Sequence, residues 1–190
     1  MEALRREERY TYADYESWPD DGKRYELIDG VIYEMLAAPA TTHQSISRNL
    51  HREIAVFLKG KPCKVFAAPF DVCLFGKGDK DDTVVQPDIV VICHRAKLDA
   101  KRCNGAPDMV IEINSPSTAS RDKVLKFNRY LAAGVREYWM VDPDTRIVQA
   151  CVLENGKYTA SAYGETDTAP VLVLDGCTIS LLDVFADSTV

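Results

Sequence analysis

The sequence has no long apolar run, and this absence argues against a membrane-spanning helix. No stretch approaches the roughly 18 consecutive apolar residues that such a helix needs. The first ten residues, MEALRREERY, are mostly charged and contain no apolar segment of the kind found in a secretory signal. We therefore expect a cytoplasmic protein.

The sequence also lacks the CxxC spacing that is typical of zinc sites and redox motifs. Its six cysteines are scattered, which favours reduced, mostly buried thiols over a disulfide framework. Cys93-His94 together with Cys103 would supply only a fragment of a metal site. The six are Cys63, Cys73, Cys93, Cys103, Cys151 and Cys177.

Positive charge is not in excess: 23 lysines and arginines stand against 29 aspartates and glutamates, a formal net charge of −6. This balance counts against a nucleic-acid partner, because such proteins are usually basic. It does not exclude one, since carboxylates that hold a divalent cation lower the charge of the bare sequence without repelling DNA once the metal is bound.

No internal repeat, low-complexity segment or linker interrupts the chain, so residues 1–190 are expected to form a single domain. A chain of 190 residues is long enough for a real core. Apolar residues make up 46% and charged residues 27%, which is ordinary for a globular protein.

The most informative stretch is 107–143, which predicts a strand, a tight turn, a helix and a second strand. Residues 109–113 are almost entirely apolar, as in a strand covered on both faces, yet they include Glu112. Burying a lone carboxylate costs several kcal/mol unless it is paired, protonated or bound to a metal. The segment Ser115-Pro116-Ser117-Thr118 offers caps for a helix over 118–133, which Gly134 ends before a strand over 135–141.

The remaining apolar runs predict an α/β fold. Asp29-Gly30 and Asn155-Gly156 each mark a hairpin, and Ile46, Leu50 and Ile54 form the buried stripe of a helix. The predicted elements are a short helix near 11–17, the hairpin 24–28 and 31–35, the helix 43–59, a long strand over 63–75 with a bend or edge at Pro69, a run over 83–93 interrupted by Pro87-Asp88, a polar connection over 94–106, the hairpin 146–153 and 157–162, closing strands at 171–174 and 177–182, and a last half-turn of helix.

Two carboxylates, Asp88 and Glu112, sit against neighbouring apolar strands and are therefore candidates to meet at one place. On the helix that follows, Asp122, Lys126 and Tyr130 share one face, while Val124, Phe127 and Leu131 form the face expected to pack on the sheet. Two carboxylates and an amine suit phosphodiester hydrolysis with Mg²⁺ or Mn²⁺.

The same residues also have a purely structural interpretation. Asp88 would then cap a turn, and Glu112 would pair with Lys123 or Arg136. The stripe on the helix would be a solvated face. Glu26 would face solvent from an alternating strand, and His43 and His51 would be cap or surface residues.

The segments PDIVV, VIEINSPST and RDKVLKFNRYLAAGVREYWMVDP, with the YELIDG hairpin and His43-Gln44, resemble the Uma2 family (formerly DUF820) of the PD-(D/E)xK restriction-endonuclease-like superfamily. The resemblance runs from about Tyr10 to Phe185 and implies a restriction-endonuclease-like core: a central mixed, twisted sheet flanked by helices, with extra β-hairpins.

Within that resemblance, Asp88 matches the aspartate of the PD element and Glu112 the acidic residue of (D/E)xK. Asn114 stands where the superfamily motif has lysine, so the resemblance implies that the lysine has moved to Lys126, with Lys123 as the alternative. Glu26 resembles a further acidic residue that assists catalysis or binds metal. Gln86 and Tyr130 are candidates for supporting contacts.

The resemblance implies an endonuclease that cleaves DNA with Mg²⁺ or Mn²⁺ held by Asp88, Glu112 and Glu26, and with Lys126 positioning water. Two alternatives stay open: a binding or assembly module on the same fold, and a nuclease acting on RNA or a small nucleotide. The strands near the ends of the chain and the exposed edge expected for the second hairpin also lead us to expect a homodimer.

Overall fold

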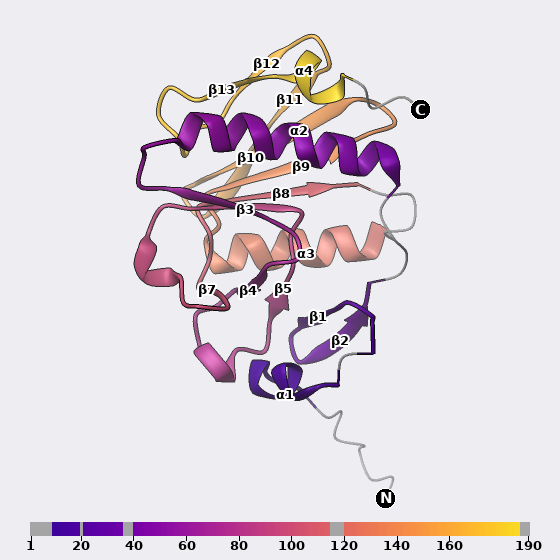
Figure 1. Ribbon diagram of the computed structural model, residues 1–190, viewed down its shortest axis with the longest axis vertical. Helices are drawn as coiled ribbons and strands as arrows, with labels where there is room; N and C mark the ends of the chain where they lie inside the picture. Colours follow the sequence, from indigo (N-terminus) through magenta and orange to yellow (C-terminus); the bar gives the residue numbers. More distant parts are fainter. Residues whose placement is uncertain (1–8, 20, 36–39, 115–119, 187–190) are drawn as a thin grey trace, which may run out of the picture.

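The structure is a computed structural model that describes residues 9–19, 21–35, 40–114 and 120–186, without the side chains of residues 120–123. Figure 1 shows helices α2 and α3 on opposite sides of the central strands, with the β1–β2 hairpin and α1 on the far side of α3. The chain is a mixed α/β protein, as predicted. No helix in the described ranges is long and apolar enough to cross a membrane.

The central sheet has six strands in the order β11-β10-β9-β8-β6-β3. Strands β8 and β9 run parallel and are joined through α3, whereas every other neighbouring pair is antiparallel, so the sheet is mixed. The elements are β3 (Lys64–Ala67), β6 (Ile89–Ile92), β8 (Met109–Ile113), α3 (Ser120–Ala133), β9 (Glu137–Asp142), β10 (Ile147–Glu154) and β11 (Lys157–Gly164).

Side chains of β8 alternate between two hydrophobic cores, as the pleat of a strand requires. Met109, Ile111 and Ile113 pack on the core that contains α2 (Thr41–Leu58), and Val110 packs on the core that contains α3. Glu112 has the same parity as Val110, so it points to the α3 side. The period of the strand therefore decides which helix faces this carboxylate.

A second sheet of five strands, ordered β2-β1-β5-β4-β7, lies beyond α3. Its first hairpin turns at Asp29 and Gly30, which both have positive φ (53° and 77°), as the Asp-Gly pair predicts. Its elements are β1 (Tyr25–Ile28), β2 (Val31–Glu34), β4 (Asp71–Cys73), β5 (Val84–Val85) and β7 (Arg102–Asn104), with α1 (Tyr12–Ser17) packed alongside.

Two prolines stand at points where the chain passes from one sheet to the other. Pro69, after a cis peptide bond, separates β3 of the central sheet from β4 of the second sheet. Pro87 likewise separates β5 from β6. The bend expected at Pro69 is therefore confirmed, but the single long strand predicted over 63–75 is wrong, because a proline cannot donate to a continuous ladder.

A two-stranded sheet and a short helix close the C-terminal end: β12 (Thr168–Pro170), β13 (Thr178–Ser180) and α4 (Leu181–Phe185). Asn49 on α2 holds α4 by donating to the carbonyls of Val184 (3.1 Å) and Ala186 (3.2 Å). The strand predicted at 171–174 is a turn region instead. The connection over 94–106 contains a 3-10 helix (Arg95–Lys97) and β7, and another 3-10 helix spans Gly78–Lys80.

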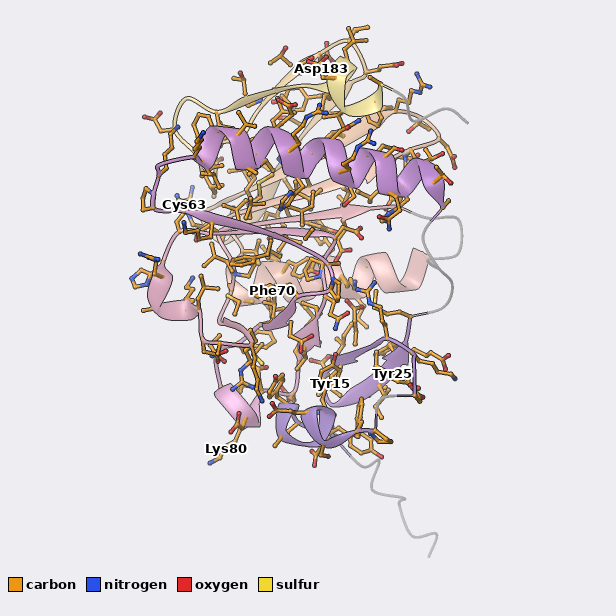
Figure 2. All side chains as sticks on the ribbon, in the orientation of Figure 1. Tyr15, Tyr25, Cys63, Phe70, Lys80 and Asp183 are labelled. Atoms are coloured by element: carbon orange, nitrogen blue, oxygen red, sulfur yellow. A yellow bond between two sulfur atoms is a disulfide. The ribbon has the colours of Figure 1, made fainter. Side chains whose placement is uncertain are left out.

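The cysteines differ in part from the sequence expectation. Cys63 and Cys93 form a disulfide, because their positions flank the Lys64–Ile92 pair where β3 and β6 run side by side. Figure 2 places Cys63 at the β3 end of the central sheet. The other four, Cys73, Cys103, Cys151 and Cys177, are buried free thiols, as predicted.

Candidate active site

Glu112 on β8 points toward α3 and meets two side chains of that helix. The Tyr130 hydroxyl donates to Glu112 Oε1 at 2.6 Å, and the Lys126 ammonium lies 3.1 Å from the same oxygen. Lys126 and Tyr130 share a helix face because they are four residues apart. Tyr130 is fully buried, and the Glu112 side chain is 17% exposed.

Lys126 bridges two carboxylates from different sheets. Its Nζ lies 2.8 Å from Glu26 Oε1 as well as 3.1 Å from Glu112, and its side chain is 14% exposed. Glu26, on β1, is only 5% exposed and also accepts a 2.9 Å hydrogen bond from the backbone N–H of Gln86. The interpretation of Glu26 as a solvent-facing residue is therefore wrong.

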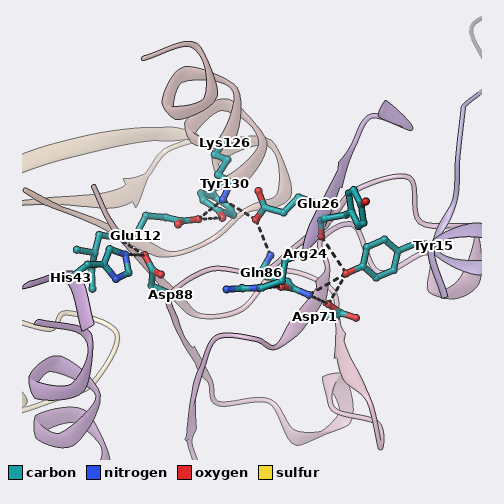
Figure 3. A network of polar contacts seen from close by, with 12 residues as sticks. Tyr15, Arg24, Glu26, His43, Asp71, Gln86, Asp88, Glu112, Lys126 and Tyr130 are labelled. Atoms are coloured by element: carbon teal, nitrogen blue, oxygen red, sulfur yellow. Dashed lines mark hydrogen bonds and ion pairs between the residues drawn. The ribbon is translucent and has the colours of Figure 1, made fainter. Parts of the chain in front are cut away.

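Asp88 lies just before β6, at the point where the chain passes from the second sheet to the central one. Its Oδ2 accepts a 2.8 Å hydrogen bond from the backbone N–H of Ile113, the residue that follows Glu112. Its carbonyl accepts a 3.0 Å bond from the N–H of Ala68. The side chains of Asp88 and Glu112 are 20% and 17% exposed, so neither extends into bulk solvent. Figure 3 shows that the two carboxylates are neighbours.

His43 is a member of the site that the sequence interpretation treated as a cap or surface residue. It is 8% exposed, and its Nε2 lies 3.3 Å from Asp88 Oδ2. A signal was present in the sequence, because His43 continues the buried stripe Ile46, Leu50 and Ile54 by one step of three residues. Burial lowers the pKa of His43, but the hydrogen bond and charge of Asp88 outweigh it, and the pKa lies above its ordinary value.

The proximity of several charges in a largely dehydrated space shifts their pKa values. Burial, followed by the charges of Asp88 and Glu26, raises the pKa of Glu112 to about 7, although Lys126 opposes this rise. Burial alone would lower the pKa of Lys126, but the charges of Glu112 and Glu26 raise it above its ordinary value. Lys126 is therefore an ammonium ion at neutral pH.

Gln86 connects this site to a second group of polar side chains (Figure 3). Its Oε1 accepts from Arg24 Nη2 (2.8 Å) and Nε (3.0 Å), and its Nε2 donates to Asp71 (2.8 Å) and to the Tyr15 hydroxyl (3.1 Å). Gln86 thus holds Glu26 through its backbone and the Arg24 guanidinium through its side chain. The supporting role expected for Gln86 stays a prediction.

A cleft of about 530 Å³ opens beside Asp88. One wall is the N-terminal half of α2, including His43 and Arg48, and Arg24 lies on another side. Ala67 and Ala68, at the end of β3, complete the lining, and their small side chains leave the space open. The cleft gives an extended ligand a path to the Asp88 carboxylate.

The donors suit a hard divalent cation. No set of three acidic, histidine or cysteine groups in the described ranges forms a complete cage for a metal ion. Mg²⁺ does not need one, since it usually binds one or two carboxylates and fills its remaining positions with water and substrate phosphate. Asp88 and Glu112 supply such carboxylates, and Glu112 is destabilised as an anion by its surroundings, which a cation would relieve.

The structural interpretation of these residues fails at several points. Arg136 pairs with Asp108 at 3.2 Å and is not the partner of Glu112. Lys126 and Tyr130 face inward, whereas Val124, predicted to pack on the sheet, is 61% exposed. The side chains of Asp122 and Lys123, and the predicted cap at Ser115-Pro116-Ser117-Thr118, lie outside the described residues.

The sequence over residues 12–183 matches the Uma2 family, which carries the description "Putative restriction endonuclease". The chain belongs to the Uma2 family. The match covers all three sheets and both long helices, so the Uma2 assignment concerns nearly the whole of the fold described above. No curated protein matches the Uma2 chain by sequence.

A solved structure similar to this Uma2 chain is the crystal structure of "a putative nuclease belonging to DUF820" from Anabaena variabilis. The two share 21% sequence identity with a TM-score of 0.73, over 92% of this chain and 97% of the other. At this identity the likeness shows the fold. Family and fold together support a nuclease of the restriction-endonuclease-like type.

Proposed function

We propose that the chain is a Mg²⁺- or Mn²⁺-dependent endonuclease that hydrolyses phosphodiester bonds in DNA. The observation that carries the proposal is the Lys126 ammonium, which lies 2.8 Å from Glu26 and 3.1 Å from Glu112 in a dehydrated site next to Asp88. Buried charged groups with shifted pKa values are concentrated at functional sites, which supports a catalytic role for this group. The family description favours DNA as the substrate.

Asp88 and Glu112 are the residues that would hold the cation. A bound Mg²⁺ would lower the pKa of a water ligand and offset the negative charge that builds on the phosphate during attack. Asp88 is fixed for this role by the N–H of Ile113, and Glu112 by the Tyr130 hydroxyl. These hydrogen bonds hold the two carboxylates in place before any ligand arrives.

Lys126 would act as a fixed positive charge and not as a base. Its raised pKa keeps the amine protonated at neutral pH, so it has no free electron pair with which to remove a proton. An ammonium ion in a partly dehydrated site stabilises negative charge on a reacting phosphate and orients the attacking water. Glu26 would keep Lys126 in position, because its carboxylate is itself held by the N–H of Gln86.

A plasmid-nicking assay in Mg²⁺ or Mn²⁺ tests the proposal. Asp88→Asn and Lys126→Met should each lower the cleavage rate at least about 100-fold, since one removes a metal ligand and the other the charge that stabilises the transition state. The matched controls are Asp144→Asn and Lys157→Met, which change exposed residues outside the site and should cleave like the wild type. Cleavage that survives in Asp88→Asn, or a wild type that leaves DNA intact with both metals, would refute it.

A binding module without turnover is the second candidate. Its support is that Lys126 already forms ion pairs with two carboxylates without a metal cation, and that the net charge is −6. Calorimetric titration with Mn²⁺ separates the two. The nuclease should bind Mn²⁺ saturably and lose this binding in Glu112→Gln, whereas the module need not bind the metal at all.

A further inference from the structure

We infer that the cleft along α2 is the surface on which one phosphodiester strand lies as it approaches Asp88. This inference rests on the proposed function for the identity of the strand as DNA. It adds a location for substrate binding, the side chains that contact the backbone, and a small number of phosphate contacts. It is based on the residues that line the cleft and on the hydrogen bonds and ion pairs that its arginines form.

Polar and basic side chains cover one face of α2 at intervals of four residues. One row is His43, Ser47 and His51, and the other is Gln44, Arg48 and Arg52; both rows line the cleft. The apolar stripe of the same helix lies against the central sheet. At about 1.5 Å per residue, eight residues of helix span roughly 12 Å, or about three to four nucleotide steps of one DNA strand.

Two of the arginines carry charges that no acidic group balances within the described residues. The hydrogen bonds of Arg24 go to the Gln86 side chain and those of Arg48 to Asn49 Oδ1, and neither arginine forms an ion pair there. Arg52 has only an exposed pair with Glu53, which water screens. The cleft therefore favours an anion, in a chain whose overall charge is negative.

The position of Arg24 indicates how that anion is held. Its guanidinium is fixed by two hydrogen bonds to Gln86, whose own amide is held by Asp71 and Tyr15. A guanidinium fixed in this way is oriented in advance, and such groups bind phosphate oxygens well. Arg24 immediately precedes β1 and Arg48 lies on α2, so a DNA strand that passes between them would be contacted by two different elements of the cleft lining.

The width of the basic surface limits the number of phosphates that it contacts. Three arginines line the cleft, and the acidic composition of the chain argues against a broad basic face. Three neutralised phosphates give a slope of log affinity against log salt of about −2.7 for duplex DNA and about −2.1 for a single strand. This is a weak salt dependence for a DNA-binding protein.

The test is fluorescence anisotropy with labelled 12-nucleotide single-stranded and duplex DNA, in EDTA so that binding is separated from cleavage. Arg48→Glu should weaken binding at least about tenfold and make the salt slope shallower by about one. The matched control Arg95→Glu reverses an exposed charge on the 3-10 helix over Arg95–Lys97, away from the cleft, and should bind within about twofold of the wild type. Melting curves confirm that both variants are folded.

Preference for the single strand or for the duplex each supports the inference and identifies the form of DNA that enters. Equal binding by Arg48→Glu and wild type, equal weakening by both variants, or no wild-type binding at 50 mM salt would overturn it. Cleavage assays keep the two proposals apart. A wild type that binds through Arg48 but never cuts refutes the nuclease alone, whereas cutting that Arg48→Glu leaves unimpaired refutes the cleft alone.

Discussion

The raised pKa of Glu112 predicts that the metal-free protein loses stability as the pH rises. An unfolded glutamate titrates near 4.5, whereas Glu112 in the folded site titrates at about 7. Between these values the native state binds a proton that the unfolded state has released, so stability falls with rising pH through this window. The loss is complete above the folded pKa.

The size of the effect follows from the two pKa values. Linkage over the interval from 4.5 to about 7 gives a decrease in the free energy of unfolding of about 2–3 kcal/mol between pH 5 and pH 8. In urea titrations this corresponds to a midpoint change of roughly 1 M. Glu112→Gln should lack this part of the pH dependence, because the amide does not titrate and its oxygen still accepts from Tyr130 and Lys126.

The assay is urea unfolding in EDTA at several pH values for the wild type, Glu112→Gln and the exposed control Glu154→Gln. Subtracting the variant from the wild type removes the contributions of other groups, such as His43, whose raised pKa acts in the same direction. A wild-type minus Glu112→Gln difference that is the same at pH 5 and pH 8 would refute the reasoning. Added Mg²⁺ should stabilise the wild type more at pH 8 than at pH 5, because a proton no longer competes for the carboxylate.

Three further predictions concern other buried groups. Tyr130→Phe should lower the free energy of unfolding by about 1–3 kcal/mol and raise the pKa of Glu112 further, since the hydroxyl donates to this carboxylate; an unchanged pKa, followed by NMR, would contradict this. Glu137→Gln should lower the free energy of unfolding by about 1–3 kcal/mol, measured by chemical unfolding, because the NH2 group of the new amide would place a donor against the Nε1–H of Trp139 or the N–H of Val173; a variant as stable as the wild type would contradict this. Alkylation of the protein unfolded in denaturant without reductant, followed by mass spectrometry, should label the four buried free cysteines, with Cys63 and Cys93 labelled only after reduction; six labelled thiols without reductant would show that the bond is absent.

Much of the fold followed from local patterns. The apolar run around Glu112, the Asp-Gly turn at residues 29 and 30, and the stripe of α2 each specify an element through its own period. The division into two sheets did not follow. Pro69 and Pro87 each predict a break in a strand, but the residues around them do not indicate which of the two sheets the chain joins after the break.

The site residues could be predicted where a charged residue interrupts an apolar segment of the sequence. Asp88 and Glu112 attracted notice as acids beside apolar strands, and they do lie together. Glu26 was harder, because a charge between Tyr25 and Leu27 is also typical of a solvent-facing position. Its burial depends on β1 packing near α3, a contact between residues 100 positions apart. The pairing of His43 with Asp88 depends in the same way on how α2 crosses the sheet.

The bridge from Lys126 to Glu26 also fastens the β1–β2 hairpin to the central sheet through α3. The Lys126 amine that the proposed reaction uses thus also connects the second sheet to the central sheet. Any substitution that weakens the contact between the β1–β2 hairpin and α3, even one far from Asp88, would move the positive charge of Lys126 away from the site. Inactive variants are therefore expected along the contact between the two sheets, and their defect would be one of assembly and not of chemistry.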